Sequence, residues 1–165
     1  MWLAALIVLG ASAAVAREPV RSLRELRQHN VVMQKWDNSC GAAALATVLT
    51  YGLNHPVSEQ DAAKGMLRRT EPLKVRYRGG FSLLDMKRFV EAAGFQGAGY
   101  RELTFEDLSR FENPIVSINV NGYAHFVVFR GLEGDDRVSL ADPAYGNRTM
   151  SRSRFANAWV SRIGF

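Results

Sequence analysis

The sequence contains a single cysteine, Cys40, among its 165 residues. One thiol cannot form an intramolecular disulfide, so the chain is not a disulfide-stapled domain. The three histidines, His29, His55 and His125, are far apart in the sequence. Clustered His and Cys ligands are needed for a zinc site, and this spacing does not supply them. We therefore expect no metal and no cofactor.

Several motifs of common enzyme classes are also absent. The sequence has no phosphate loop ending in Gly-Lys-Ser/Thr, no Gly-x-Gly-x-x-Gly, no His-Glu-x-x-His and no Gly-x-Ser-x-Gly. The net charge is +5, but Arg and Lys are spread along the chain rather than massed. The densest basic run, "RTMSRSR" at residues 148–154, is too short to indicate nucleic acid, and we expect it to be a solvated face. No nucleic-acid partner is predicted.

The first sixteen residues are apolar and uncharged and end in Ala14-Val15-Ala16. This pattern predicts a secretory signal peptide over residues 1–16, cleaved after Ala16, and a periplasmic protein of a Gram-negative cell. Because no Lys or Arg precedes the apolar run, an uncleaved inner-membrane anchor and a true start further upstream stay open. Contact with a membrane is expected only through this segment. Residues 17–165, of ordinary globular composition, are predicted to form one domain.

Helix signals dominate the first part of the chain. After a lead-in arm or short helix at residues 17–33, helices are expected from Cys40 to Gly52, from Ser58, from Ser82 to Ala93 and from Thr104. Strand signals follow in "PIVSINV", "AHFVVFRGL" and "DRVSLAD", then a short helix from Ser153 and a closing strand. Helices first and an antiparallel sheet second indicate an α+β fold.

Cys40 stands directly before the helical run "GAAALATVL". Unpaired N–H groups and the helix dipole at such a position favour the thiolate, which is the nucleophilic form. The simpler interpretation is an inert, buried thiol. An exported protein has no structural use for one unpaired thiol, so Cys40 is either fully buried or functional.

A histidine and an acid are placed to assist this thiol. A thiolate needs an imidazole to pair with it and to protonate the leaving amine, and His125 opens a strand. Asp142 ends the next strand, 17 residues later. Because the start of one strand and the end of the next are adjacent in a hairpin, Asp142 should lie beside His125 and orient it. Asp135 and Asp136 belong to the turn at the far end. A core histidine and a plain Asp-Pro turn are the alternatives.

Acyl transfer also requires hydrogen-bond donors for the oxyanion. The backbone N–H of Cys40 is one, and the amide of Gln34, six residues earlier, is the second candidate. Trp36, Gly41, Gly79 and Gly80 are candidates for substrate binding, because glycines and aromatics beside a nucleophile can line a narrow groove. Such a groove would favour segments with small residues, Gly-Gly in particular. A plain turn and a core tryptophan remain the alternatives.

The segments "QKWDNSCGAAALATVL", "FSLLDMKRFVEAAGF", "PIVSINVNGYAHFVVFRG" and "VSLADPAYGNRTMSRSRFANAW" carry a family resemblance. The chain resembles the papain-like bacteriocin-processing peptidases, family 39 of the cysteine peptidases, over most of residues 34–160. The resemblance implies a papain-like fold and a thiol peptidase. It also implies Cys40 as nucleophile, His125 as base and acid, Asp142 as orienting residue and Gln34 as oxyanion donor.

The chain departs from the family pattern in two ways. Members often have an acid just before the cysteine, where this chain has Ser39, and here we expect an export signal before the domain and no transporter after it. It is therefore more similar to stand-alone exported members, some of which accompany functional-amyloid (Fap-type) secretion. A peptide or secreted protein is the expected partner. A non-catalytic groove that binds an extended peptide, and transglutaminase-like acyl transfer, are the two other functions that the residues allow.

Overall fold

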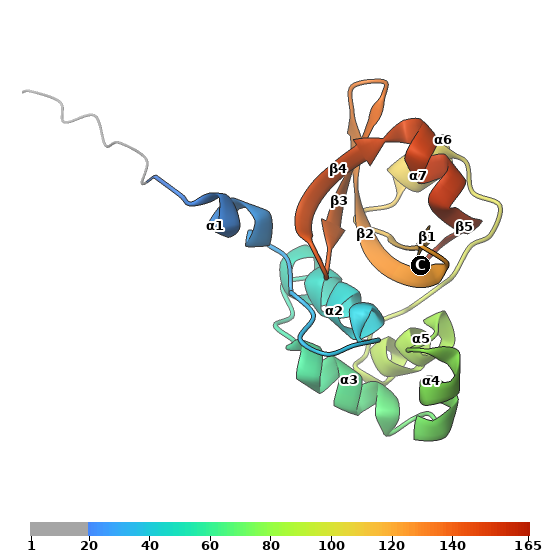
Figure 1. Ribbon diagram of the computed structural model, residues 1–165. Helices are drawn as coiled ribbons and strands as arrows, with labels where there is room; N and C mark the ends of the chain where they lie inside the picture. The colour runs from blue at the N-terminus through green and yellow to red at the C-terminus, as the bar shows by residue number, and fades with distance from the viewer. Residues whose placement is uncertain (1–19) are drawn as a thin grey trace, which may run out of the picture.

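The computed structural model describes residues 20–165, so the predicted signal segment lies outside the described residues. The described chain forms two parts, a group of helices below and a sheet with two covering helices above (Figure 1). The predicted helices are present, and a short π-helical turn, η1, continues α2 to Gly52. The helices are α1 (Leu23–Gln28), α2 (Cys40–Thr47), η1 (Val48–Gly52), α3 (Glu59–Leu67), α4 (Pro72–Arg78), α5 (Leu83–Ala92), α6 (Phe105–Arg110) and α7 (Arg152–Ala158).

The five strands form one antiparallel sheet in the order β4-β3-β2-β1-β5. Helices precede it and only α7 interrupts it, so the predicted α+β layout is confirmed. None of the helices within residues 20–165 is long and apolar enough to cross a membrane. The strands are β1 (Ile115–Val120), β2 (Tyr123–Glu133), β3 (Arg137–Asp142), β4 (Gly146–Ser151) and β5 (Trp159–Gly164).

Three helices begin at the residues that the sequence predicted. The side chains of Ser58, Ser82 and Thr104 each accept a hydrogen bond from the backbone N–H three residues later. The carboxylates of Asp85 and Asp107 in turn accept a hydrogen bond from the backbone N–H of Ser82 and Thr104, which completes capping boxes. These local signals determine where α3, α5 and α6 start.

Two elements were not predicted. Helix α4 begins with Pro72 at its first turn, ends at Gly79 in a left-handed conformation, and has no buried residue. Strand β4 contains residues 148–151 of the basic run that was expected to be a solvated face, and α7 contains the rest of the run. The expectation is wrong for Arg148, which pairs with Leu140 across the sheet and is partly buried, whereas Arg154 is exposed.

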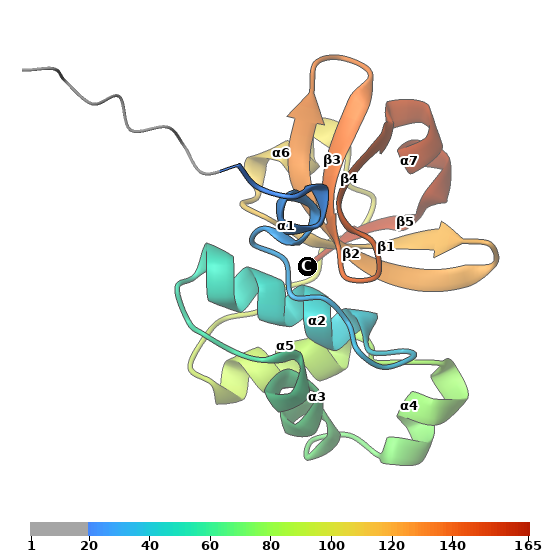
Figure 2. The same ribbon diagram turned by 60° about the vertical axis from the view of Figure 1, so that its left-hand side comes forward.

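The sheet has an apolar core on each face. Ile115, Val128 and Ala141 form a row across three strands and pack with α2, α3 and α5. Their neighbours along the strands face α6 and α7 on the other side. Helix α2 is rich in alanine and almost wholly buried, and small side chains let its backbone approach the sheet closely. The first turn of α2 is therefore fixed near the start of β2 (Figure 2).

Candidate active site

A groove runs between the helices and the sheet, and four separate segments form its wall. These are the loop before α2, the end of α4, the β1–β2 hairpin and the β3–β4 turn. The groove brings together Cys40, His125 and Gln34, which are up to 91 residues apart (125 − 34). Its lining residues are Gln34, Asn38, Cys40, Gly79, Val120, Asn121, Tyr123, Ala124, His125, Ala144 and Tyr145.

Cys40 is the first residue of α2 and is only partly buried, so its thiol is accessible from the groove. Burial alone would raise the pKa of this thiol. Hydrogen bonds from the His125 side chain and from the Phe126 and Gly41 backbone, together with the charge on His125, outweigh burial and leave the pKa below its ordinary value. A partly exposed thiol with a lowered pKa is typical of a nucleophile rather than of inert core.

The predicted pairing of His125 with Asp142 is confirmed. The Nε2 atom of His125 lies 2.7 Å from Oδ1 of Asp142. Side chains two residues apart on a strand share a face, and cross-strand partners do too. His125 therefore lies on the same face of the sheet as Val127. Asp142 lies on the same face as Leu140, and so does Arg148, the cross-strand partner of Leu140. Asp135 and Asp136 are exposed in the turn at the far end, as expected.

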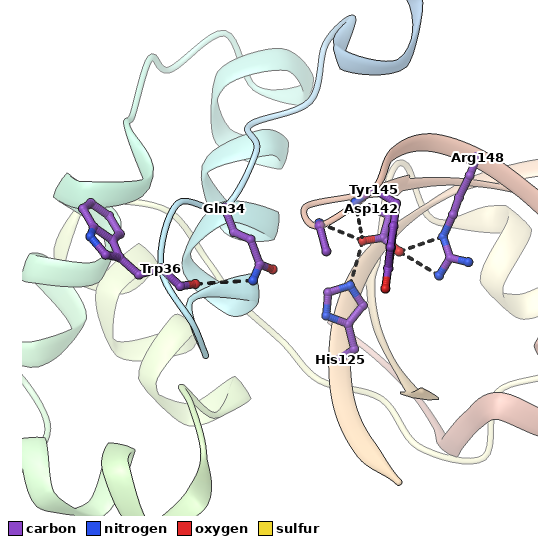
Figure 3. A network of polar contacts seen from close by, with 7 residues as sticks. Gln34, Trp36, His125, Asp142, Tyr145 and Arg148 are labelled. Carbon is purple, nitrogen blue, oxygen red and sulfur yellow. Dashed lines mark hydrogen bonds and ion pairs between the residues drawn. The ribbon is translucent and has the colours of Figure 1, made fainter. Parts of the chain in front are cut away.

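Asp142 is fully buried and is held by four hydrogen bonds and one further ion-pair contact (Figure 3). Its Oδ1 atom accepts from His125 and from the backbone N–H groups of Ala144 and Tyr145, at 2.9 and 3.3 Å. Its Oδ2 atom accepts from Nε of Arg148 at 2.7 Å, and Nη2 of Arg148 forms an ion pair with the same oxygen, also at 2.7 Å. Burial works to raise the pKa of Asp142, but the bond and charge of His125, the Ala144 N–H and the Arg148 charge keep it below its usual range. The carboxylate is therefore ionised and oriented toward the imidazole.

The imidazole of His125 favours its charged form. Burial lowers its pKa, but the Asp142 carboxylate and the Cys40 thiolate outweigh burial and raise the pKa of His125 to about 9. The shifts of Cys40 and His125 are opposite in direction. Opposite shifts of two neighbouring groups favour a thiolate–imidazolium pair, the resting form of a thiol nucleophile with its acid.

Gln34 lies on the loop before α2, on the groove side, as predicted for an oxyanion donor. Its backbone N–H donates to the carbonyl of Pro143 at 2.8 Å, which ties this loop to the turn that follows Asp142. Its side-chain Nε2 donates to the Trp36 carbonyl at 3.3 Å, and because an amide has two hydrogens, a second donor is available. Figure 3 shows this side chain extending to the side on which His125 lies.

The four residues predicted to bind substrate differ in whether they line the groove. Gly79 lines the groove, and the space beside its α-carbon is open. Gly80 lies behind it, against the Asn38 carbonyl. Trp36 is 49% exposed, and its ring points away from His125 (Figure 3). The expectation that Trp36 forms part of the groove wall is therefore wrong.

Gly41 is buried, and the expectation that it leaves room for substrate is wrong. A Cβ atom there would lie 2.7 Å from Cε of Met86 and 3.3 Å from the Phe126 ring. Glycine at this position therefore allows α2 to pack against α5 and β2. Its backbone N–H, but not its missing side chain, contributes to the site by bonding Cys40.

Sequence reasoning missed Arg148, Tyr123 and Tyr145. Arg148 lies in the basic run interpreted as solvated, and only the alternation of "GNRTMS" after the Asp-Pro turn could have indicated a strand that places it beside Asp142. The two tyrosines flank the groove and are 78% and 59% exposed. Exposed aromatics at strand ends gave no signal distinct from ordinary surface residues.

Comparison with known proteins identifies a family for this chain. The model of the peptidase C39 family matches residues 28–163. The "Probable functional amyloid protease FapD" of Pseudomonas aeruginosa is 43% identical over 141 residues, covering 85% of this chain and 61% of that protein. The protein of the same name from Pseudomonas fluorescens is 42% identical over 147 residues, covering 88% and 64%. This chain thus spans less than two thirds of the length of these two relatives.

Solved structures show the same architecture. A double glycine motif protease from an AMS/PCAT transporter, in complex with its leader peptide, has a TM-score of 0.64 and 27% identity over 81% of this chain and 86% of that one. The peptidase domain of Streptococcus ComA has a TM-score of 0.63 and 20% identity over 82% and 96%, a likeness of fold. The fold is therefore that of the papain-like C39 peptidase domains. The chain belongs to the peptidase C39 family of cysteine peptidases.

Proposed function

We propose that this protein is an exported cysteine peptidase that cleaves a secreted partner protein after small residues such as Gly-Gly. Cys40 acts as nucleophile, His125 as acid and base, Asp142 as orienting residue and Gln34 as oxyanion donor. The observation that carries the proposal is the pairing of Cys40 and His125, whose pKa values are shifted in opposite directions in one open groove.

The geometry supports an acyl-enzyme mechanism. The Cys40 thiolate adds to the carbonyl carbon of the scissile bond, and the oxygen takes the electron pair released from the C=O bond. The Gln34 amide and the Cys40 N–H donate to this oxyanion. When the C–N bond breaks, His125 gives its proton to the leaving amine nitrogen, and a thioester remains on Cys40.

Water then completes the cycle. Neutral His125 takes a proton from a water molecule, whose oxygen adds to the thioester carbon. The C–S bond breaks, the acid product leaves, and the thiolate and imidazolium are restored. Asp142, fixed by Arg148 and two backbone N–H groups, holds the imidazole in one orientation through both halves.

The substrate class is proposed from two sources. The groove is lined by small residues, Ala124, Ala144 and Gly79, next to His125 and Cys40. One relative by structure is a double glycine motif protease bound to a leader peptide, and two relatives by sequence are named functional amyloid proteases. A glycine-containing segment of a secreted or amyloid-forming protein fits the small residues of the groove and the names of these relatives. A periplasmic location, with or without a membrane anchor in residues 1–16, is part of the proposal.

Labelling and cleavage together test the proposal. Purified wild-type protein and Cys40→Ala are incubated with an iodoacetamide probe and with peptides that contain one Gly-Gly pair, and products are identified by mass spectrometry. We expect wild type to be labelled at Cys40 and to cut after Gly-Gly, and Cys40→Ala to do neither. A labelled thiol that cuts none of the peptides would contradict the peptidase and favour the binding groove. Transfer of the acyl group to an added amine instead of water would favour acyl transfer.

A further inference from the structure

Glu59 is a buried carboxylate that the proposed mechanism does not use. It belongs to the first turn of α3 and is 3% exposed. Its Oε1 atom accepts two hydrogen bonds, from the Ser39 hydroxyl at 2.6 Å and from the Lys35 backbone N–H at 2.9 Å. Its Oε2 atom is buried without a hydrogen-bond partner. Burying a carboxylate costs free energy, so an acid at this position requires an explanation other than packing.

The two partners of Glu59 bracket the loop that carries the oxyanion donors. Lys35 directly follows Gln34, and Ser39 directly precedes Cys40. One carboxylate oxygen therefore holds both ends of the same loop, although α3 begins 19 residues after Cys40 (59 − 40). A shift of the loop would change the separation of the Gln34 amide from the Cys40 N–H, and oxyanion stabilisation depends on that geometry.

The contact also changes what Ser39 does. Serine is a preferred N-cap residue, and Ser39 occupies the N-cap position of α2, yet its side chain makes no capping bond. The hydroxyl lies 2.6 Å from both Glu59 Oε1 and the Trp36 carbonyl, and with one hydrogen it serves one acceptor at a time. Directed away from α2, it leaves the N–H groups of the first turn free for the thiolate and the oxyanion.

The same carbonyl connects the network to Gln34. The Trp36 oxygen accepts from Gln34 Nε2 at 3.3 Å as well as facing the Ser39 hydroxyl. When Ser39 donates to Glu59, the Trp36 carbonyl is left to Gln34, which fixes the rotation of the amide and the direction of its second N–H.

We propose that Glu59 is a positioning residue that fixes the loop of residues 34–40 so that Gln34 and the Cys40 N–H act together as the oxyanion hole. It does not touch the substrate. The inference rests on the proposed peptidase function, since an oxyanion forms only in acyl transfer.

Two probes of Cys40 separate this role from a general effect on the fold. Alkylation by iodoacetamide needs the thiolate but no oxyanion donor. When the aldehyde acetyl-glycyl-glycinal binds, the thiolate Sγ adds to the aldehyde carbon and the electron pair of the C=O π bond moves to the oxygen. This oxygen lies at the oxyanion hole and takes the proton of His125 to give a thiohemiacetal. We expect Glu59→Leu to weaken aldehyde binding and to lower peptide kcat/KM by about tenfold or more. This loss should be smaller than the roughly 10²–10³-fold loss of rate when an oxyanion donor is removed altogether. The alkylation rate should stay unchanged.

Matched variants complete the test. Glu59→Gln retains an acceptor oxygen for Ser39 and Lys35 and should keep most of the aldehyde affinity. Asp61→Asn changes an exposed acid of the same helix turn and should have no effect. If Glu59→Leu does not fold, Ser39→Ala removes the hydroxyl link alone and should show the same selective loss, smaller in size. In a Gln34→Ala background the effect of Glu59→Leu should shrink, because the donor it positions is gone.

The outcomes are distinguishable. Equal losses in alkylation and aldehyde binding, or a Glu59→Leu protein that binds the aldehyde like wild type, would overturn the positioning role. Full additivity with Gln34→Ala would do the same. A wild-type protein that is alkylated at Cys40 but neither binds the aldehyde nor cuts peptides would instead overturn the proposed function.

Discussion

His125 and Cys40 hold their charges over a pH range that free side chains do not. The thiolate forms as pH rises through the lowered pKa of Cys40, and the imidazolium is lost as pH rises through about 9. Peptide hydrolysis needs both groups charged, because the imidazolium protonates the leaving amine, whereas alkylation needs only the thiolate. We expect a bell-shaped kcat/KM with its alkaline limb near pH 9, and an alkylation rate that rises once and does not fall.

Measuring both rates over the same pH series checks this difference. These limits belong to the coupled pair rather than to one residue. An alkaline limb near 6.5, the value of an ordinary histidine, would contradict the charged imidazole. The raised pKa of His125 also makes the stability of the fold depend on pH. Because the pKa of His125 is raised by folding, its contribution is fully present below about 6.5 and is lost as pH rises through about 9.

Arg148 gives the fully buried Asp142 a second cationic partner beside His125. A hydrogen bond from Nε and an ion-pair contact from Nη2, both of 2.7 Å, join it to Oδ2, and its side chain is 26% exposed. Arg148→Gln should remove one of the two cationic partners of the buried carboxylate and let it move relative to His125. We expect kcat/KM to fall on the order of 10- to 100-fold, since small misplacements have large effects on rate, and the free energy of unfolding to fall by about 3 kcal/mol or less.

Two variants control for charge in general. Arg148→Lys keeps the cation but cannot form two bonds in one plane, so it should recover only part of the rate. Arg154→Gln removes an exposed arginine of the same run and should leave the rate unchanged. A fully active Arg148→Gln would show that the backbone N–H groups of Ala144 and Tyr145 hold Asp142 by themselves.

Among elements, the turn between β3 and β4 connects the site to the N-terminal arm. Gly146 opens β4 with a φ of +79°, and a Cβ atom there would lie 2.4 Å from the backbone oxygen of Arg27 in α1. Asn147 adds bonds from Nδ2 to the Leu26 and His29 carbonyls. Gly146→Ala therefore combines backbone strain with a clash that α1 or the turn must relieve.

We expect Gly146→Ala to reduce the free energy of unfolding by about 1–3 kcal/mol, the usual cost of a new steric overlap. Gly134→Ala is the matched control. Gly134 has a φ of +62° and open space around its α-carbon, so alanine brings strain without a clash. Denaturant unfolding of both variants separates the two costs. Equal losses would mean that α1 does not pack firmly against this turn.

Helices whose start is marked by a capping residue could be predicted from the sequence. Elements that form because of packing or pairing with distant segments could not. Ser58, Ser82 and Thr104 cap their helices within four residues, so α3, α5 and α6 were located correctly. Strand β4 is polar and is defined by its pairing with β3, and α4 buries no residue. Neither has a hydrophobic period that would distinguish it from surface.

The same distinction applies to the site. Cys40, His125 and Asp142 each stand at the end of a recognisable element, and a hairpin brings the last two together, so their proximity followed from the sequence. Glu59 and Trp36 show the limit. Glu59 acts on the loop across 20 residues, and the direction of the Trp36 ring depends on side-chain packing, which no short sequence pattern records.

Over the whole molecule, the groove between the helices and the sheet limits what can reach Cys40. Ala124 and Ala144 lie beside His125, Gly79 forms the opposite wall, and Tyr123 and Tyr145 flank the groove. Side chains this small at the wall allow the backbone of an extended peptide to approach, and the flanking rings leave little room for bulk at the cut. We therefore expect cleavage of a peptide library after small residues only.

A single series measures the strength of this selection. Replacing the glycine at the cut site by leucine should lower kcat/KM at least tenfold, about 1.4 kcal/mol of transition-state binding. The same replacement several residues from the cut controls for solubility and overall hydrophobicity, and it should have little effect. Adding bulk to the wall with Gly79→Ala would strain a residue with φ of +73° and should reduce cleavage of the glycine peptide itself. Efficient cleavage after large or charged residues would show that the groove opens further than its lining indicates.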